Sequence, residues 1–391
     1  MANVSSSNGL EKRPKLRFPG FDEPWEICKA ESLLRNITDK NHPDDTVLTI
    51  VQGKGTLPRD KSGRNIHYDD ASLSNYKRVE KGDFIIHLRS FEGGLEMAHE
   101  TGIVSPAYTI LRCSKPHSSL FYEAYFHTDE FINHVLSKAV EGIRDGRQIS
   151  YEAFKWLGIP YCANAEQEKI SALFEAINRR IEKQEQIVNA LKKYKRGLLS
   201  NLFGEKITQG CTTKSYYFSE IAQRRSEKYN PTSGIEYPCV ELENIEQETG
   251  KILATVPSTA QSSIKNIAMP GDTLFGKLRP YLRKYAFAKK TMACSSEIWA
   301  LIPSDVVLPK FLFYLVQTEQ FLRVANISSG TKMPRAEWSN IEKAEFFIPD
   351  FSVQRKVVFL LEGLDQKITF ADSTLLSLNR LKASLLQQLF I

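Results

Sequence analysis

The feature that most constrains this chain is a long helical pattern that occurs twice. Residues 166–203 and 353–390 align without a gap at a shift of 187 residues. The matching positions include Gln167 with Gln354, Lys169 with Lys356, Ile181 with Ile368, Leu198-Leu199 with Leu385-Leu386 and Leu202-Phe203 with Leu389-Phe390. A period close to half the chain length indicates two copies of one structural unit.

Both segments place apolar residues at heptad a and d positions. Eight of ten such positions are apolar in the first segment, and nine of ten in the second. A 3.5-residue repeat sustained over this length predicts a coiled-coil seam, and ordinary long core helices are the alternative. The seam is interrupted at one shared position, which is Lys195 in the first segment and Lys382 in the second. A lysine can lay its stem on a seam and send its charge outward. We therefore predict that these two lysines contact a partner protein.

The rest of the chain shows two segments of mixed strand and helix pattern, which predicts an α+β fold. Strand-like runs occur at 46–52, 83–88 and 107–112, and again at 272–275 and 297–302. Amphipathic helical patterns follow at about 120–138 and 309–323. The predicted order is a disordered tail at 1–17, a first globular domain at 18–163, a first long helix at 164–204, a second globular domain at 205–350 and a second long helix at 351–391.

The repeat extends into the globular segments at scattered anchor points. Gly82-Asp83 corresponds to Gly271-Asp272, and Ile159-Pro160 corresponds to Ile348-Pro349. The loops between these anchors differ. A duplicated scaffold with divergent loops is expected where each copy recognises something different.

Composition narrows the class of protein. The formal net charge of +6 permits nucleic acid as a partner without requiring it. No apolar run approaches the roughly 18 residues that span a bilayer, and the N-terminus has no secretory signal pattern. The six cysteines form no CxxC pair, so neither a zinc site nor a redox motif is indicated. We expect a cytoplasmic protein that has no membrane segment and no metal site.

No catalytic constellation stands out in the sequence. The segment 271–278 approaches a phosphate-binding loop but lacks the hydroxyl residue that would hold magnesium. Ser105-Pro106 resembles part of a methyltransferase loop but lacks the second proline. Pro349-Asp350 with Asp365 and Lys367 matches a loose nuclease pattern, but its second pair falls on the long helix. We therefore predict a chain without enzymatic activity or a cofactor of its own.

A basic stretch with interleaved aromatic residues is the strongest positive signal. Residues 277–290 contain six basic residues and three aromatic residues, and no acidic residue. Arginine can bridge a guanine or clamp a phosphate, and lysine neutralises phosphate. The predicted DNA contacts are Lys277, Arg279, Tyr281, Arg283 and Lys284, and a solvated strand edge is the alternative. The matching first-half stretch keeps Arg89, which is also a predicted DNA contact, but adds Glu92 and Glu96.

Two glycine-containing turns form a second candidate. The turn at 144–148 carries Arg144 and Arg147, and the turn at 328–332 carries Lys332, with Arg335 shortly after it. Recognition residues concentrate on loops of a rigid scaffold. We predict DNA contact from these four residues, and plain connecting turns are the alternative.

The duplicated order of these elements resembles the specificity subunit of type I restriction–modification systems. The marks are Ile159-Pro160 and Ile348-Pro349, the helix starts at Gln167 and Gln354, and the Leu-Leu-x-x-Leu-Phe ends at 198–203 and 385–390. The opening at 16–21, followed by Trp25-Glu26, is also similar to that family. The second globule begins at 216–218 without a Pro-Gly-Phe opening, so its start is less well defined.

The resemblance implies a non-catalytic subunit that recognises double-stranded DNA. In this family two target-recognition domains each read one half of a split target. An antiparallel coiled coil separates them and docks two copies of a methyltransferase subunit, which holds S-adenosylmethionine. A translocase–endonuclease subunit completes the complex. The alternatives are a coiled-coil scaffold protein without DNA specificity and a single-chain methyltransferase.

Overall fold

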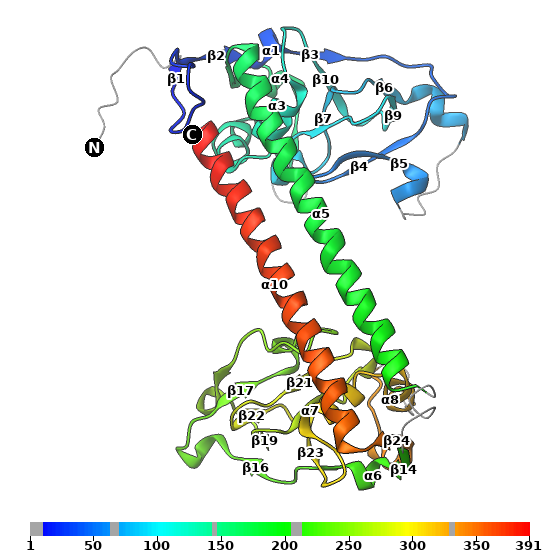
Figure 1. The fold of residues 1–391 in the computed structure, drawn as a ribbon. Helices are drawn as coiled ribbons and strands as arrows, with labels where there is room; N and C mark the ends of the chain where they lie inside the picture. Colours follow the sequence, from blue (N-terminus) through cyan, green and yellow to red (C-terminus); the bar gives the residue numbers. More distant parts are fainter. Residues whose placement is uncertain (1–10, 63–69, 143–146, 205–212, 328–332) are drawn as a thin grey trace. The chain divides into compact units, whose positions relative to one another are not determined.

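The computed structural model of this chain describes residues 11–62, 70–142, 147–204, 213–327 and 333–391 (Figure 1). It divides into two compact units. The first unit comprises Met1–Glu185 with Ser373–Ile391, and the second comprises Gln186–Asp372. Each unit therefore contains one globule together with part of each long helix.

The two long helices are α5 (Asn164–Leu202) and α10 (Phe351–Phe390), drawn in green and in orange to red in Figure 1. In the first unit, the rings of Phe174 in α5 and Phe390 in α10 lie 6.2 Å apart. In the second unit, Lys195 in α5 pairs with Asp365 in α10 at 2.7 Å. The start of α5 thus meets the end of α10 in one unit, and the reverse holds in the other. This confirms an antiparallel pair, and all the predicted seam positions are buried or half-buried.

A buried glutamine fixes the start of each long helix. The side-chain oxygen of Gln167 accepts a hydrogen bond from the Ser118 amide at 3.0 Å, and its amide group donates to the Cys162 carbonyl at 2.8 Å. Gln354 repeats both contacts with Leu308 and Pro349, at 2.8 and 2.9 Å. The internal repeat therefore extends to matching buried polar contacts, which bind each helix to its globule.

The globule of the first unit is built on an antiparallel sheet of order β3-β10-β7-β8. These strands are Leu34–Ile37, Thr109–Cys113, Phe84–Ile86 and Glu96–Met97. A second sheet joins β1 (Glu11–Lys12), β2 (Trp25–Lys29) and β13 (Gly158–Tyr161). Two-stranded pairs are β4 (Leu48–Val51) with β5 (Gly55–Pro58), β6 (Lys77–Val79) with β9 (Gly102–Val104), and β11 (Val140–Glu141) with β12 (Gln148–Ile149). Its short α-helices are α1 (Ala30–Leu33), α2 (Ser90–Gly93), α3 (Ser119–Phe126) and α4 (Tyr151–Phe154).

The globule of the second unit repeats this plan with the sheet β15-β23-β20-β21. These strands are Ala222–Arg224, Ile298–Pro303, Thr273–Gly276 and Tyr285–Phe287. A five-stranded sheet adds β16 (Lys228–Tyr229), β19 (Lys265–Ala268), β22 (Met292–Cys294), β17 (Pro238–Val240) and β18 (Val256–Pro257). β14 (Thr213–Tyr217) pairs with β24 (Glu345–Pro349). The short α-helices are α6 (Phe218–Ile221), α7 (Pro309–Leu315), α8 (Glu319–Ala325) and α9 (Trp338–Ile341).

Both predicted helices inside the globules are interrupted at a threonine. In the first unit, α3 ends at Phe126 and a π-helical turn follows at Glu130–Val135. The Thr128 hydroxyl donates to the Tyr125 carbonyl and accepts from the Phe131 amide. Thr318 makes the same two bonds between α7 and α8. A side chain that satisfies both helix ends makes a break favourable. The helical stretches predicted at about 120–138 and 309–323 are therefore present, each divided into shorter helical segments.

The predicted disorder of residues 1–17 is wrong for residues 11–17. β1 pairs with β2, and the Leu16 amide donates to the Gln388 carbonyl at 3.0 Å. Arg17 forms a bidentate pair with the buried carboxylate of Glu166, at 2.9 and 2.7 Å. A polar composition did not reveal these partners because they lie far away along the chain. Residues 1–10 lie outside the described part.

In the described ranges, the structure has no helix both long and apolar enough to cross a membrane.

Candidate nucleic-acid interface

The predicted basic stretch forms a tight turn between β20 and β21. Pro280–Leu282 make one 3₁₀ turn, and the residues on either side, Arg279 and Arg283, both have a positive φ of 51°. This conformation costs a non-glycine residue roughly 1–2 kcal/mol. Contacts hold it in place, since the Arg279 amide donates to the Pro334 carbonyl at 2.7 Å. Backbone strain that the surrounding structure maintains is common in recognition loops.

The side chains of this turn fall into two groups. Arg279 is exposed and has no side-chain partner among the described residues, and Tyr281 is 53% exposed. Arg283 pairs with Glu319 at 2.6 Å and with Glu248 at 3.5 Å. The Lys284 ammonium donates to the Leu242 carbonyl at 2.6 Å. Arg279 and Tyr281 are therefore free to contact DNA, whereas Arg283 and Lys284 already have partners within the second unit.

Two further predicted contacts converge on one carboxylate. Arg335 and Lys277 lie 3.1 and 3.9 Å from the carboxylate of Glu297. Hydrogen bonding to Glu297 raises the pKa of Arg335. The fold brings these two predicted residues together from distant segments. The sequence did not reveal that Glu297 offsets part of their charge. Lys332 lies outside the described residues.

The same face of the second unit contains a groove that sequence reasoning missed. Arg224 lies 4.7 Å from the ring centre of Trp338 and 5.7 Å from that of Trp299. The two indole rings meet edge to face at 5.6 Å. Two adjoining hollows of about 570 and 460 Å³ share Arg224, Lys277 and both tryptophans as walls. Only Lys277 and Arg335 of this groove stood out in the sequence, because Arg224 and the tryptophans belong to separate strands and a short helix.

In the first unit, Arg89 and Arg147 are both exposed. The Arg147 guanidinium lies 4.4 Å from the centre of the Phe91 ring. Arg89 precedes α2 and has no side-chain partner among the described residues. Arg144 lies outside the described residues. The structure therefore leaves Arg89 available for contact, in an environment unlike that of Arg279.

The acidic residue Glu96, which distinguishes the first copy, does not lie on its surface. Glu96 is fully buried, and its carboxylate accepts hydrogen bonds from the amides of Gly53 and Gly55 at 2.7 and 2.9 Å. Burial would raise its pKa, but these bonds and the nearby His127 lower it overall. Glu96 thus braces the β4–β5 hairpin and does not place negative charge on the face that carries Arg89.

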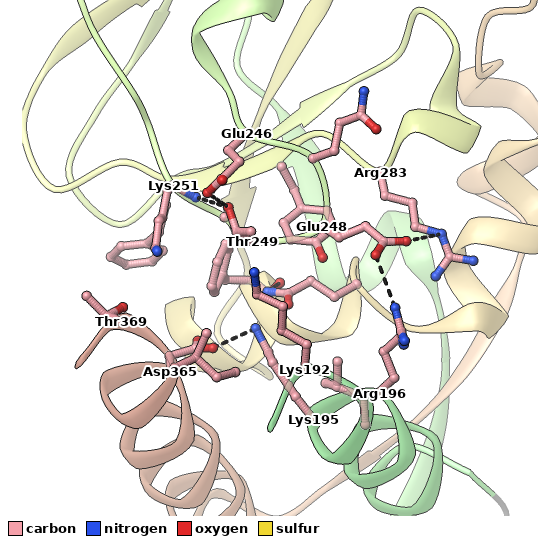
Figure 2. Close-up of a pocket in the computed structure, with 18 of the residues that line it drawn as sticks. Lys192, Lys195, Arg196, Glu246, Glu248, Thr249, Lys251, Arg283, Asp365 and Thr369 are labelled. Atoms are coloured by element: carbon pink, nitrogen blue, oxygen red, sulfur yellow. Dashed lines mark hydrogen bonds and ion pairs between the residues drawn. The ribbon is translucent and has the colours of Figure 1, made fainter. Parts of the chain in front are cut away.

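The coil lysine of the second unit lies in a pocket of about 350 Å³ that has both charged and apolar walls (Figure 2). The Lys195 side chain is only 8% exposed, and its ammonium pairs with Asp365 at 2.7 Å. The Tyr314 hydroxyl donates to the same carboxylate at 2.9 Å, and burial raises the pKa of Tyr314. Figure 2 also shows Arg196 and Arg283 pointing at Glu248. The expectation that Lys195 sends its charge outward is therefore wrong, while its role in partner docking stays a prediction.

The coil lysine of the first unit lies in a larger pocket of about 760 Å³. Lys382 is half-buried, and desolvation lowers its pKa although Glu123 acts in the opposite direction. The pocket is lined by Asn178, which aligns with Asp365 at the shift of 187. Within the described residues Lys382 has no ion-pair partner.

Across the described residues, no group of three or more His, Cys, Asp or Glu side chains is placed to hold a metal ion.

Comparison with known proteins finds a match in the second half of the chain. Residues 218–380 match the family model described as the type I restriction modification DNA specificity domain. A curated relative is the type I restriction enzyme HindI specificity subunit of Haemophilus influenzae, which is 26% identical over 198 residues. That match covers 46% of this chain and 40% of the relative, so it spans less than half of either protein.

Two solved structures share the fold over nearly the whole chain. One is the type I restriction–modification system S subunit from M. genitalium, with a TM-score of 0.56, 16% identity, and coverage of 97% of this chain and 99% of that one. The other belongs to work on complex assembly and conformational transition of the type I restriction–modification system, with the same TM-score and identity and coverage of 96% and 99%. These likenesses confirm the α+β architecture of two globules and two long helices.

Proposed function

Residues 218–380 belong to the family of type I restriction–modification DNA specificity domains, and from this premise we propose that the chain is the DNA-recognition subunit of such a complex. Each globule reads one half of a split double-stranded DNA target. The two globules share the order of one four-stranded sheet but differ in their other strands and loops, as two readers of different base sequences require.

The observation that carries this proposal is the family match, because the matched segment includes the strained turn and its free side chains. Arg279 and Tyr281 project from a turn that its neighbours hold in place. A bidentate arginine contact to guanine discriminates by roughly 1–3 kcal/mol against other bases. Two half-sites at a fixed spacing multiply this discrimination, which one short half-site cannot supply alone.

The long helices serve, in this proposal, as the docking surface for two copies of a methyltransferase subunit. S-adenosylmethionine belongs to that partner, and a translocase–endonuclease subunit acts with it to cleave DNA. The chain itself contributes recognition and no catalytic group. A chain that holds its own cofactor would bind S-adenosylmethionine in isolation, and calorimetry of the purified chain tests this directly.

The alternative is a coiled-coil scaffold that binds only proteins. None of the matches described above favours it. The free Arg279 and the cationic groove of the second unit also distinguish the two proposals, because a protein-binding scaffold has no need of a sequence-independent attraction to phosphate.

Binding of the purified chain, with its methyltransferase partner, to DNA duplexes at several salt concentrations tests the proposed function. We expect affinity that falls steeply with salt, together with a preference for one split sequence. Binding that ignores DNA sequence at every salt concentration would favour the scaffold.

A further inference from the structure

The groove beside the strained turn is lined mainly by cationic and polar side chains. Its larger hollow contains four cationic side chains and no carboxylate, and the cations are Arg224, Arg225, Lys228 and Lys277. Hydroxyl and amide groups of Ser219, Ser226, Ser296, Asn266 and Gln223 complete the polar wall. Such a lining suits an anion that carries several hydrogen-bond acceptor atoms.

Two of these cations are already engaged. Arg225 forms a bidentate pair with the buried Asp272, at 2.6 and 2.9 Å. The Lys228 ammonium donates to the Asn266 side chain at 2.6 Å. Their charges still contribute to the potential in the groove, but their donors are directed to protein acceptors. The Arg224 donors remain available, and Lys277 also has an ion pair, since its ammonium lies 3.9 Å from the Glu297 carboxylate, but it donates no hydrogen bond to another described residue.

Arg224 is held in position by the tryptophan pair. Its guanidinium lies 4.7 Å from the ring centre of Trp338 and 5.7 Å from that of the buried Trp299, and the two rings meet edge to face. The Arg224 side chain is exposed and has no hydrogen-bond or ion-pair partner among the described residues. A guanidinium that stacks on an aromatic ring keeps its N–H groups at the edge of the plane, where they can take two oxygens at once. The contacts with the two rings therefore restrict where the guanidinium lies before a ligand binds.

The first unit does not repeat this site. Asn36 takes the position of Arg224, because Arg224 pairs with Leu301 in β23 and Asn36 pairs with Leu111 in β10. Thr109 takes the position of Trp299 by the same register. Phe154, fully buried, aligns with Trp338. The equivalent positions thus hold neither a cation nor an indole, so the groove is a specialisation of the second copy.

We propose that this groove binds a backbone phosphate of the DNA, with Arg224 as the bidentate contact and Lys277 as a second charge. The proposal rests on the proposed function, because it assumes that DNA lies against the second unit. It assigns Arg224 to positioning, whereas Arg279 on the adjacent turn reads bases. A phosphate contact fixes the register of a duplex and is independent of sequence.

The test compares the full-length chain with its Arg224→Ala and Arg224→Lys variants on short duplexes of mixed sequence at several salt concentrations. We expect Arg224→Ala to weaken binding roughly tenfold at low salt, because a charge-assisted contact is lost. The slope of log affinity against log salt should fall by about 0.9, the value for one released counterion. Arg224→Lys should keep the slope but recover only part of the affinity, since an ammonium cannot make the bidentate contact.

The matched control is Lys343→Ala, which removes the same charge from an exposed lysine of the same unit that does not line the groove. It should leave both slope and affinity near the wild-type values. Thermal melting of each variant checks that folding is unchanged.

Each outcome decides the proposal separately from the proposed function. Equal losses on all duplexes with a reduced slope support it. An unchanged salt slope in Arg224→Ala overturns the phosphate contact but leaves DNA recognition by the chain intact. A loss of affinity confined to duplexes with one particular base pair also overturns it, because Arg224 would then be a base contact. Absence of any salt-dependent DNA binding by the wild-type chain overturns both proposals.

Discussion

The two coil lysines occupy the same heptad position in the two copies, yet their surroundings differ. Lys195 pairs with Asp365, which also accepts a hydrogen bond from Tyr314. Lys382 shares its pocket with Asn178, the residue that aligns with Asp365, and has no ion-pair partner among the described residues. Both copies keep the lysine and the apolar seam, but the position that holds Asp365 in one copy holds Asn178 in the other. The same heptad position is therefore ion-paired in one copy, whereas in the other the lysine forms no ion pair with a described residue and shares its pocket with Glu123.

Other repeated contacts show where the copies were free to diverge. Asp83 and Asp272 align, and each forms a bidentate pair with an arginine. The arginines differ in origin, since Arg112 lies in β10 and Arg225 directly follows β15. The buried carboxylate of each copy thus kept a cationic partner, although from a different strand. Contacts that satisfy buried charge are retained, and exposed positions such as Arg224 and Asn36 differ.

The largest expected contrast comes from replacing each lysine with methionine. Lys195→Met leaves Asp365 without its cation, and we expect a loss of roughly 1–3 kcal/mol in the free energy of unfolding, because Asp365 is 29% exposed and partly solvated. Lys382→Met removes a partly desolvated charge and should have no destabilising effect. Denaturant titration of the full-length chain measures both. Equal losses in the two variants would contradict the different roles of the two lysines.

A smaller contrast comes from exchanging the aligned residues. Asp365→Asn keeps a hydrogen-bond acceptor for Tyr314 but removes the ion pair, so we expect a loss of about 1 kcal/mol. Asn178→Asp adds a carboxylate to the pocket that Lys382 also lines and should stabilise the chain by up to roughly 0.5 kcal/mol. The melting temperatures of the two single variants, compared with the wild-type chain, show whether each change stabilises or destabilises the fold. A stabilising effect of Asp365→Asn would show that the pair in the second unit does not hold the coil.

The smallest expected effect is a pH dependence confined to Lys382. Desolvation lowers the pKa of Lys382 in the folded chain below its ordinary value. Folding therefore disfavours the protonated form, and this penalty is fully present below the folded pKa. It disappears as the pH rises from the folded pKa to the unfolded value, so stability increases over that window.

The measurement is the difference in melting temperature between Lys382→Met and the wild-type chain. We expect this difference to favour the variant near neutral pH and to shrink at alkaline pH. Taking the difference removes the contributions of other lysines, because they titrate in both proteins. A difference that is constant with pH would show that Lys382 has the same pKa in the folded and unfolded chain.

The sequence predicted the scaffold well because its signals are periodic. The heptads of α5 and α10 are long enough to define both helices and their seam, and the antiparallel pairing implied by the resemblance is confirmed. The breaks at Thr128 and Thr318 were missed because each depends on one hydroxyl that satisfies two backbone groups. A capping hydrogen bond does not change the spacing of apolar residues, so the sequence pattern does not reveal it.

The candidate site was predicted only in part, for a different reason. The segment 277–290 is basic in sequence, and the structure does place Arg279 and Tyr281 on an exposed turn. Arg283 pairs with Glu319 and Arg335 pairs with Glu297, and both glutamates lie far from their partners along the chain. Arg224, Trp299 and Trp338 form a site only through the pairing of β15 with β23 and the position of α9. Composition along the chain contains no information on such tertiary neighbours.

The central claim is that the two copies read different halves of one DNA target. Selection of bound duplexes from a random pool tests it most directly, using the chain with its methyltransferase partner and the variants Arg279→Ala and Arg89→Ala. We predict that the wild-type chain selects a split motif, that Arg279→Ala relaxes one half of it, and that Arg89→Ala relaxes the other. Selection of no split motif, or relaxation of the same half by both variants, would contradict the account.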